Sequence, residues 1–142
     1  MPSDIDSLTA RINDSFDRQS LMATLGARLL QVGKGAVDIE APIGPGVLQQ
    51  QDFAHAGLTF AIGDSAAGYS ALSLMRPDQE VLTTEMKIHL LAPAAGERLI
   101  ARGRVIKPGR RIMVVQSDVF AVTDGQERHV ALLTGSMIPV DL

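Results

Sequence analysis

The segment that most constrains this chain is residues 53–75, "FAHAGLTFAIGDSAAGYSALSLM", which predicts a long apolar helix. A helix that is apolar all round has no face suited to water, so it must be buried against the rest of the protein. Between His55 and Met75 it carries one formally charged residue, Asp64. That charge, together with several small and hydroxyl residues, makes the segment a poor membrane span. We therefore expect a buried central helix with a lone carboxylate in its middle.

The chain after this helix alternates with period two, which predicts strands. We expect strands within 80–94, 97–107, 111–124 and 128–140, with a turn at 108–110 and a hairpin at Asp124-Gly125. In the first of these strands, the alternation places Thr83 opposite an apolar row. That row consists of Leu82, Thr84, Met86, Ile88 and Leu90.

The chain before the central helix predicts a second helix and one further strand. In residues 28–42, Gly33 and Gly35 are typical of a hairpin turn, and Val37, Ile39 and Ala41 then alternate with polar residues. One helix laid on one curved antiparallel sheet is an α+β architecture. The helix is expected over residues 7–23, ends before Gly26, and has an apolar face made of Leu8, Ile12, Phe16 and Met22.

Composition narrows the classes of function. The 142 residues suit one domain with a core of its own, and no repeat or linker divides them. A net charge of -3 gives no basic footprint, so we expect no nucleic-acid partner. The absence of cysteine excludes disulfides and thiolate chemistry. The polar, acidic N-terminus is the opposite of a secretory signal, so we expect a cytoplasmic protein with no membrane partner. His89 and His129 have no partners at ligand spacing, so we assign no metal, and we expect a structural role for His129.

The central helix contains two features that suit acyl-transfer chemistry. An isolated charge in an apolar setting costs several kcal/mol unless something compensates it, and no Lys or Arg lies within two helical turns of Asp64. The residue types alone leave a catalytic and a structural Asp64 equally open. The small residues of His55-Ala56-Gly57 open the helix, where free N–H groups suit an oxyanion hole. Close packing for Gly57 and a capping hydrogen bond for His55 are the alternatives.

The spacing of these two features constrains the assembly. Ala56 and Asp64 are eight residues apart, roughly 12 Å along one helix axis. They cannot both touch one substrate carbonyl from the same helix. Two antiparallel helices related by a twofold axis would bring Asp64 of one chain against Ala56 of the other. The sequence thus predicts a site that is built twice, at a dimer interface.

The segments "HAGLTFAIGDSAAGYSAL" and "TTEMKIHLLAPAAGERLIARGRVIKPGRRIMVVQSDVF" resemble the hotdog-fold acyl-CoA thioesterases of the PaaI-like type. The resemblance implies a hotdog domain over about residues 24–139, with residues 1–23 as an N-terminal helical segment. In that fold a long helix is wrapped by a five- or six-stranded antiparallel sheet. The implied activity is hydrolysis of an acyl-CoA thioester to free acid and CoA, without a cofactor, in a homodimer or a tetramer of paired dimers.

The resemblance also implies roles for individual residues. Asp64 matches the family's catalytic acid, a general base for water or a nucleophile on the thioester, and Ala56 matches the N–H donor to the thioester oxygen. Gln49 falls where the family has a side chain that supports the carbonyl, although the run 49–51 leaves its register open. Thr83 matches a hydroxyl that orients water, whereas the alternation puts Thr84 in the apolar row. His55-Ala56-Gly57 stands where the family usually has His-Gly-Gly, and Leu90 replaces an aromatic that bears on acyl specificity.

The basic residues of the predicted turn at 108–110 have two interpretations. Lys107, Arg110 and Arg111 form either a solvated hairpin tip or a clamp for the phosphates of coenzyme A, because guanidinium groups pair well with phosphate. Two rival functions remain beside hydrolysis. An acyl-CoA hydratase would need a paired Asp and His, and a non-catalytic acyl-CoA-binding protein normally carries a DNA-binding segment. Generic Leu, Met, Phe and Ala leave the acyl group undetermined.

Overall fold

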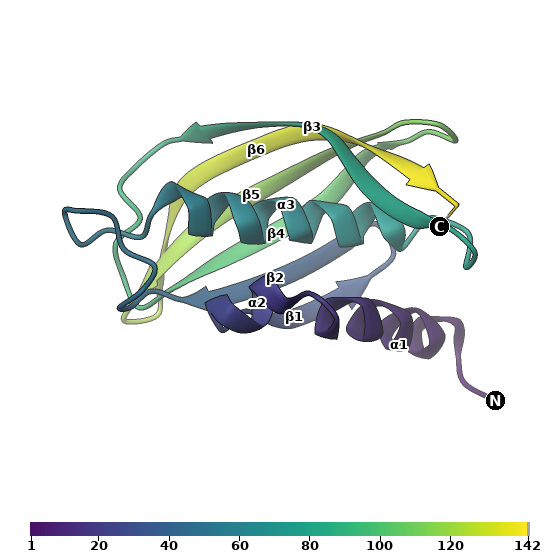
Figure 1. The fold of residues 1–142 in the computed structure, drawn as a ribbon, viewed down its shortest axis with the longest axis horizontal. Coiled ribbons are helices and arrows are strands. Elements are labelled where there is room, and N and C mark those ends of the chain that lie inside the picture. The colour runs from purple at the N-terminus through teal and green to yellow at the C-terminus, as the bar shows by residue number, and fades with distance from the viewer. Residues whose placement is uncertain (142) are drawn as a thin grey trace.

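In the computed structural model, which describes residues 1–141, a six-stranded antiparallel sheet curves around the central helix α3 (Ala56–Leu72) (Figure 1). The sheet order is β1-β2-β4-β5-β6-β3, so β1 and β3 are its edges. The predicted α+β architecture is confirmed, and residues 28–42 supply two strands rather than one. The strands are β1 (Arg28–Gly33), β2 (Ala36–Pro42), β3 (Glu80–Leu90), β4 (Arg98–Pro108), β5 (Met113–Thr123) and β6 (Gln126–Val140).

Small residues let α3 lie close to the middle of the sheet. A Cβ on Gly103 of β4 would stand 2.4 Å from the backbone of Ala66, so only glycine fits where strand and helix meet. The Ser117 hydroxyl of β5 donates to the Gly63 carbonyl of α3 at 2.6 Å. Within residues 1–141, no helix is long and apolar enough to cross a membrane. The apolar character of α3 is therefore explained by the sheet that wraps it.

The N-terminal region forms two helices, α1 (Asp4–Asp17) and α2 (Ser20–Leu25), and the prediction of one helix was wrong. Leu8, Ile12 and Phe16 are four residues apart and share the buried face of α1. Met22 comes six residues after Phe16, which would turn it about 120° away from that face on a continuous helix. The break at residues 18–19 lets Met22 reach the core, where it is 1% exposed.

Strand β3 does not keep the predicted alternation, because a bulge interrupts its pairing with β6. Thr83 pairs with Met137 and Glu85 pairs with Ser136, so Thr84 is the extra residue. Residues before the bulge therefore point to the opposite face of the sheet from the one that the alternation predicts. Leu82, for example, is 49% exposed instead of lying in an inward row. Thr83 consequently points toward α3, and the placement of Thr84 in the apolar row was wrong.

The C-terminal end of α3 is held by polar contacts from distant segments. Ser70 and Ser73 accept hydrogen bonds from the N–H groups of Val37 and Gly35, at 3.0 and 2.7 Å, which fixes α3 to the β1–β2 hairpin. The Arg11 guanidinium of α1 donates to four backbone carbonyls, at 2.5 to 3.5 Å. One belongs to the last residue of α3, and three belong to the segment that follows it. One arginine therefore caps the helix end from another element. The carbonyls belong to Leu72, Met75, Arg76 and Gln79.

Candidate active site

His55 is the N-cap of α3 and holds the first turn in place. Its Nδ1 accepts a hydrogen bond from the Gly57 N–H at 2.8 Å, which is the capping contact that the sequence left as the alternative for His55. A Cβ on Gly57 would stand only 3.0 Å from the same ring nitrogen, so glycine gives the imidazole room to close on the backbone. The His55 N–H in turn donates to the Val47 carbonyl at 2.8 Å, which ties the cap to the preceding loop.

The cap leaves one backbone donor of the first turn available. The Gly57 N–H is taken by His55, and the Leu58 N–H donates to the His55 carbonyl at 2.9 Å. The N–H of Ala56, the first residue of α3, has no hydrogen-bond partner within residues 1–141. Its position at a helix N-terminus favours a partner that carries negative charge. Ala56 therefore offers the donor that the sequence predicted.

Gln49 is oriented by its own loop. Its Oε1 accepts from the N–H groups of Gln51 and Phe53, the latter at 3.3 Å. Its Nε2 donates to Gln51 Oε1 at 3.4 Å, and an amide nitrogen carries a second hydrogen that can be donated to another group. Gln49 and Gln51 line the pocket at the start of α3, whereas Gln50 is exposed and does not. The structure thus favours Gln49 over Gln50 as the residue beside Ala56.

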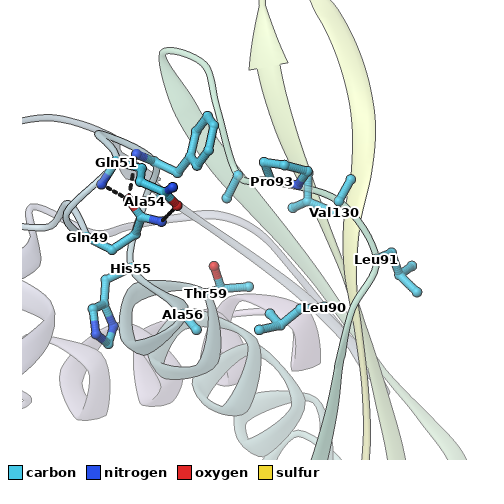
Figure 2. Close-up of a pocket in the computed structure, with 13 residues that line it drawn as sticks. Gln49, Gln51, Ala54, His55, Ala56, Thr59, Leu90, Leu91, Pro93 and Val130 are labelled. Carbon is cyan, nitrogen blue, oxygen red and sulfur yellow. Dashed lines mark hydrogen bonds between the residues drawn. The ribbon is translucent and has the colours of Figure 1, made fainter.

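A pocket of about 560 Å³ opens at the N-terminal end of α3 (Figure 2). The loop 49–56 forms one side of it, and the end of β3 with the turn 91–94 forms the other. Leu90 and Leu91 are 58% and 53% exposed, so this wall offers apolar surface. The sequence interpretation named Gln49, His55, Ala56 and Leu90 here but missed Thr59. Its spacing of three residues from Ala56, on the same helical face, was the available signal.

Asp64 lies in the middle of α3 and is partly buried. Its Oδ1 accepts a hydrogen bond from the Thr83 hydroxyl, with 2.8 Å between the oxygens. Burial raises the pKa of the Asp64 carboxyl above its ordinary value, and the Thr83 hydrogen bond offsets part of this effect. No cation within residues 1–141 pairs with this carboxylate. Asp64 is thus an isolated carboxylate whose basicity is increased by its surroundings.

Thr83 reaches Asp64 because the β3 bulge turns it inward. Its hydroxyl also lies 3.1 Å from the Met137 sulfur of β6, so β3 and β6 together fix its position. Thr84 instead donates to the Ser136 carbonyl at 3.0 Å and makes no contact with Asp64. Of the two threonines, Thr83 is therefore the one beside the carboxylate.

Within one chain, the remaining predicted residues lie far from Ala56. Asp64 is not among the residues that line the pocket, as expected from its separation of roughly 12 Å along α3. The basic turn, with exposed Lys107, Arg110 and Arg111, lies at the C-terminal end of α3 (Figure 1). There Arg110 borders a depression of about 360 Å³ beside Leu74. One chain therefore brings together neither Ala56 and Asp64 nor Ala56 and the basic turn.

His129 lies on β6 in a group of side chains away from the pocket. Its Nε2 is 3.0 Å from Asp118 Oδ1, and its ring stacks on Phe120 with 4.9 Å between centroids. Arg102 lies over the same phenyl ring, at 4.9 Å from its centroid. These contacts fit the structural role predicted for His129. His89 is exposed on β3.

Comparison with known proteins places this chain in a family. A profile of the Thioesterase superfamily matches residues 51–127, from the loop before α3 into β6. No curated protein sequence matches the chain. Among solved structures, a thioesterase family protein from Silicibacter pomeroyi is 41% identical, with a TM-score of 0.92, and the match covers 95% of this chain and 99% of that one.

Two more distant structures share the fold alone. The PaaI protein of the phenylacetic acid degradation operon of E. coli is 20% identical, with a TM-score of 0.85 and coverage of 97% of this chain and 96% of that one. A thioesterase from Haemophilus influenzae is 18% identical, with a TM-score of 0.81 and coverage of 92% and 89%. The chain belongs to the thioesterase superfamily and has the PaaI-like hotdog fold. It is a thioesterase, and its general reaction is thioester hydrolysis.

Proposed function

We propose that this thioesterase hydrolyses acyl-CoA to free acid and CoA, in active sites shared between the two chains of a homodimer. One observation carries the proposal. Among residues 1–141, neither the N–H of Ala56 nor the carboxylate of Asp64 has a partner of opposite charge, and the two groups lie on one continuous helix, roughly 12 Å apart. A carbonyl oxygen needs its donor at about 3 Å, and the attacking atom must reach the adjacent carbon. A second α3 must therefore supply one of the two groups.

The chemistry follows from what each group can do. The thioester oxygen accepts hydrogen bonds from the Ala56 N–H and from Gln49, and the positive end of the helix stabilises the charge that develops there. Asp64 of the other chain removes a proton from the attacking water, or attacks the carbonyl carbon itself, while Thr83 holds the carboxylate in place. The carbon–sulfur bond breaks, and the CoA thiolate takes up the proton that Asp64 removed from water and leaves as its thiol. If Asp64 attacks the carbonyl carbon itself, a water molecule then hydrolyses the mixed anhydride; it releases the free acid, regenerates the carboxylate and supplies the thiol's proton. Because a thioester is already an activated acyl donor, the proposal needs no cofactor.

The position of the twofold axis can be worked out from the helix. If Asp64 of one chain is level with Ala56 of the other, the axis crosses α3 halfway between them, at Phe60, roughly 6 Å from Asp64. Asp64 lies beside Thr83, and 6 Å along a strand is about two residues. The axis then meets β3 near Glu85, the middle residue of Glu80–Leu90. If the β3 strands of two chains pair antiparallel about their midpoints, the twofold axis also passes near Glu85.

The exposed side chains along this axis support a second copy of the chain. β3 is an edge of the sheet, and such an edge offers unpaired N–H and C=O groups to another strand. Phe60 is 36% exposed, although it lies on the central helix, and Leu82 on β3 is 49% exposed. A dimer about this axis would cover both side chains. A tetramer made of two such dimers would leave the shared sites unchanged.

The same dimer gives the basic turn a role in substrate binding. In one chain, Arg110 lies at the C-terminal end of α3, far from Ala56. In antiparallel helices, the C-terminal end of the partner's α3 lies beyond the N-terminal end of the first. Lys107, Arg110 and Arg111 of the partner would then lie outside the mouth of the pocket. This position suits the phosphates of CoA, which are remote from the reacting carbonyl.

Complementation between two inactive variants tests the shared site. Asp64→Ala removes the carboxylate, and Ala56→Pro removes the donor N–H. Proline is well tolerated at the first position of a helix, and His55 already has φ -62 and ψ 142, which suit a residue before proline. A screen of short, medium, long and aryl acyl-CoAs first selects the substrate. Each variant is then assayed alone and after subunit exchange in an equal mixture.

The expected result has a defined size. Random exchange makes about half of the dimers mixed, each with one intact site, so the mixture should recover about a quarter of the wild-type activity. Two differently tagged Asp64→Ala chains, exchanged in the same way, should recover none. If the exchanged mixture stays as inactive as both parents, the shared-site model is wrong. If no acyl-CoA is hydrolysed by the wild-type protein, the substrate class is wrong.

A further inference from the structure

Thr59 is a buried polar residue for which the proposed mechanism has no role. It lies one helical turn beyond Ala56 on α3, lines the same pocket, and is 1% exposed. Figure 2 shows its hydroxyl pointing off the helix, with no hydrogen bond to any other residue drawn there. A hydroxyl that has so little contact with water and no partner in the protein destabilises the fold. Its place in the pocket therefore needs an explanation.

The usual partner of a helical threonine hydroxyl is the carbonyl four residues earlier. For Thr59 this is the carbonyl of His55, which already accepts from the N–H groups of Leu58 at 2.9 Å and Thr59 at 3.5 Å. Ser70, one helical turn after Ala66, does make such a bond, at 2.7 Å to the Ala66 carbonyl. Both donors to the His55 carbonyl come from the first turn of α3, and the Thr59 hydroxyl has no hydrogen-bond partner within residues 1–141.

The free hydroxyl opens onto the pocket. Within residues 1–141, no side-chain oxygen or nitrogen is both sealed from solvent and without a hydrogen-bond partner. The Thr59 hydroxyl has no partner among those residues, so it is not sealed. The opening available to it is the pocket that Thr59 lines. It can therefore reach a molecule bound there.

The surroundings of the hydroxyl indicate which part of a substrate it meets. Thr59 lies about 4.5 Å further along the helix axis than Ala56, on the same face. The side chains across from it, Leu90, Pro93 and Val130, are apolar. Gln49 and His55 lie at the loop end of the pocket, beside the Ala56 N–H. When Ala56 binds the thioester oxygen, Thr59 provides a polar atom on the otherwise apolar side of the pocket.

We infer that Thr59 selects acyl groups that carry an oxygen, a hydroxyl or oxo group, within a few bonds of the thioester carbonyl. This inference rests on the proposed acyl-CoA hydrolysis and names its substrate class. A threonine hydroxyl both donates and accepts, so it can pair with either kind of oxygen. A plain hydrocarbon chain would leave the hydroxyl unpaired and would bind less well. Thr59 is a specificity-determining residue.

Matched pairs of substrates test the inference. The pairs are butyryl-CoA with 3-hydroxybutyryl-CoA and hexanoyl-CoA with 3-hydroxyhexanoyl-CoA, and the quantity compared is the kcat/KM ratio within each pair. The wild-type ratio should favour the hydroxylated member by about 3- to 10-fold, the effect of one neutral hydrogen bond. Thr59→Val keeps the shape and removes the hydroxyl, so the ratio should fall to about 1. Thr59→Ser keeps the hydroxyl and should retain the preference.

The controls separate this inference from the proposed function. Thr24→Val makes the same chemical change at an exposed position of α2 and should leave the ratio unchanged. A wild-type ratio near 1, or an equal loss for both members of a pair in Thr59→Val, overturns the inference while acyl-CoA hydrolysis stands. Failure to hydrolyse any acyl-CoA overturns both. If Thr59→Val does not fold, the wild-type ratio alone still decides, because the inference requires it to favour the hydroxylated substrate.

Discussion

Removing the charge of Asp64 should make the protein more stable and much less active. Asp64 is partly buried, and its contact within one chain is a hydrogen bond from Thr83. Burial raises the pKa of its carboxyl, so the folded protein holds this proton more tightly than the unfolded chain does. Stability from this group is fully present below about pH 4, the ordinary range of aspartate, and is lost as pH rises through the raised pKa. At neutral pH, the ionised carboxylate therefore destabilises the fold.

Asp64→Asn isolates the charge, because the amide Oδ1 still accepts from Thr83 and the side-chain volume hardly changes. We expect a gain of about 0.5–2 kcal/mol in the free energy of unfolding at pH 7, typical of relieving a destabilised functional position. For a chain of this size, this corresponds to roughly 2–8 °C in Tm. The gain should shrink toward zero as pH falls below about 4, where the wild-type carboxyl is also neutral. The kcat should fall at least about 100-fold, as for removal of a general base.

Thermal unfolding followed by circular dichroism at equal chain concentration measures the stability, and acyl-CoA turnover measures the activity. Asp141→Asn makes the same change at an exposed position and should alter neither quantity. An Asp64→Asn protein that unfolds at or below the wild-type temperature at pH 7 would refute the desolvation argument. A folded Asp64→Asn or Asp64→Ala protein with near-normal turnover would refute the catalytic role.

Three further predictions follow from the same contacts. Asp64 must be ionised to act as a base, and burial raises its pKa. As the pH is lowered, a pH–rate profile should therefore show kcat/KM falling already above the ordinary pKa range of aspartate. Replacing Arg110 and Arg111 together by Ala should raise KM for acyl-CoA more than it lowers kcat, and a pantetheine thioester should show little change. Arg11→Met should lower the free energy of unfolding by about 2–4 kcal/mol, because the carbonyls of Leu72 and the residues beyond it lose their donor. Arg11→Lys should recover only part of this loss. If denaturant titrations give Arg11→Met the same stability as the wild-type protein, the capping role is contradicted.

The elements that the sequence predicts well are those fixed by local chemistry. Residues 53–75 are apolar in every direction, so a buried helix is the favoured arrangement for them. The Asp124-Gly125 hairpin was predicted from its turn residues, and both have positive φ, of 50° and 75°. The hotdog fold was predicted through the resemblance. Part of that resemblance is the spacing of His55 and Asp64, which lie at the start and in the middle of the same helix. The helix and the hairpin depend on neighbours within a few residues, whereas the resemblance rests on segments within about residues 24–139.

The features that the sequence did not predict depend on pairing between distant segments. The bulge at Thr84 could not be located, because Thr83, Thr84 and Glu85 are all tolerated on either face of an edge strand. The cap supplied by Arg11 joins residues more than 60 positions apart. A weak signal existed, since the last turn of α3 has no basic residue of its own. The free hydroxyl of Thr59 depends on which donors occupy the His55 carbonyl, which alternation does not reveal.

The exposure along α3 explains why a carboxylate is found in so apolar a helix. The face toward the central strands is buried, as at Gly63 and Ala66, whereas Phe60 and Asp64 lie one turn apart on a stripe that the chain covers only in part. The carboxylate thus lies on the side of α3 that is open to another molecule. In the proposed dimer, a second α3 would cover this stripe and bring an Ala56 N–H to the carboxylate's level. Assembly and catalysis would then depend on the same face of the helix, because the surface that makes Asp64 accessible is the one that the partner must complete.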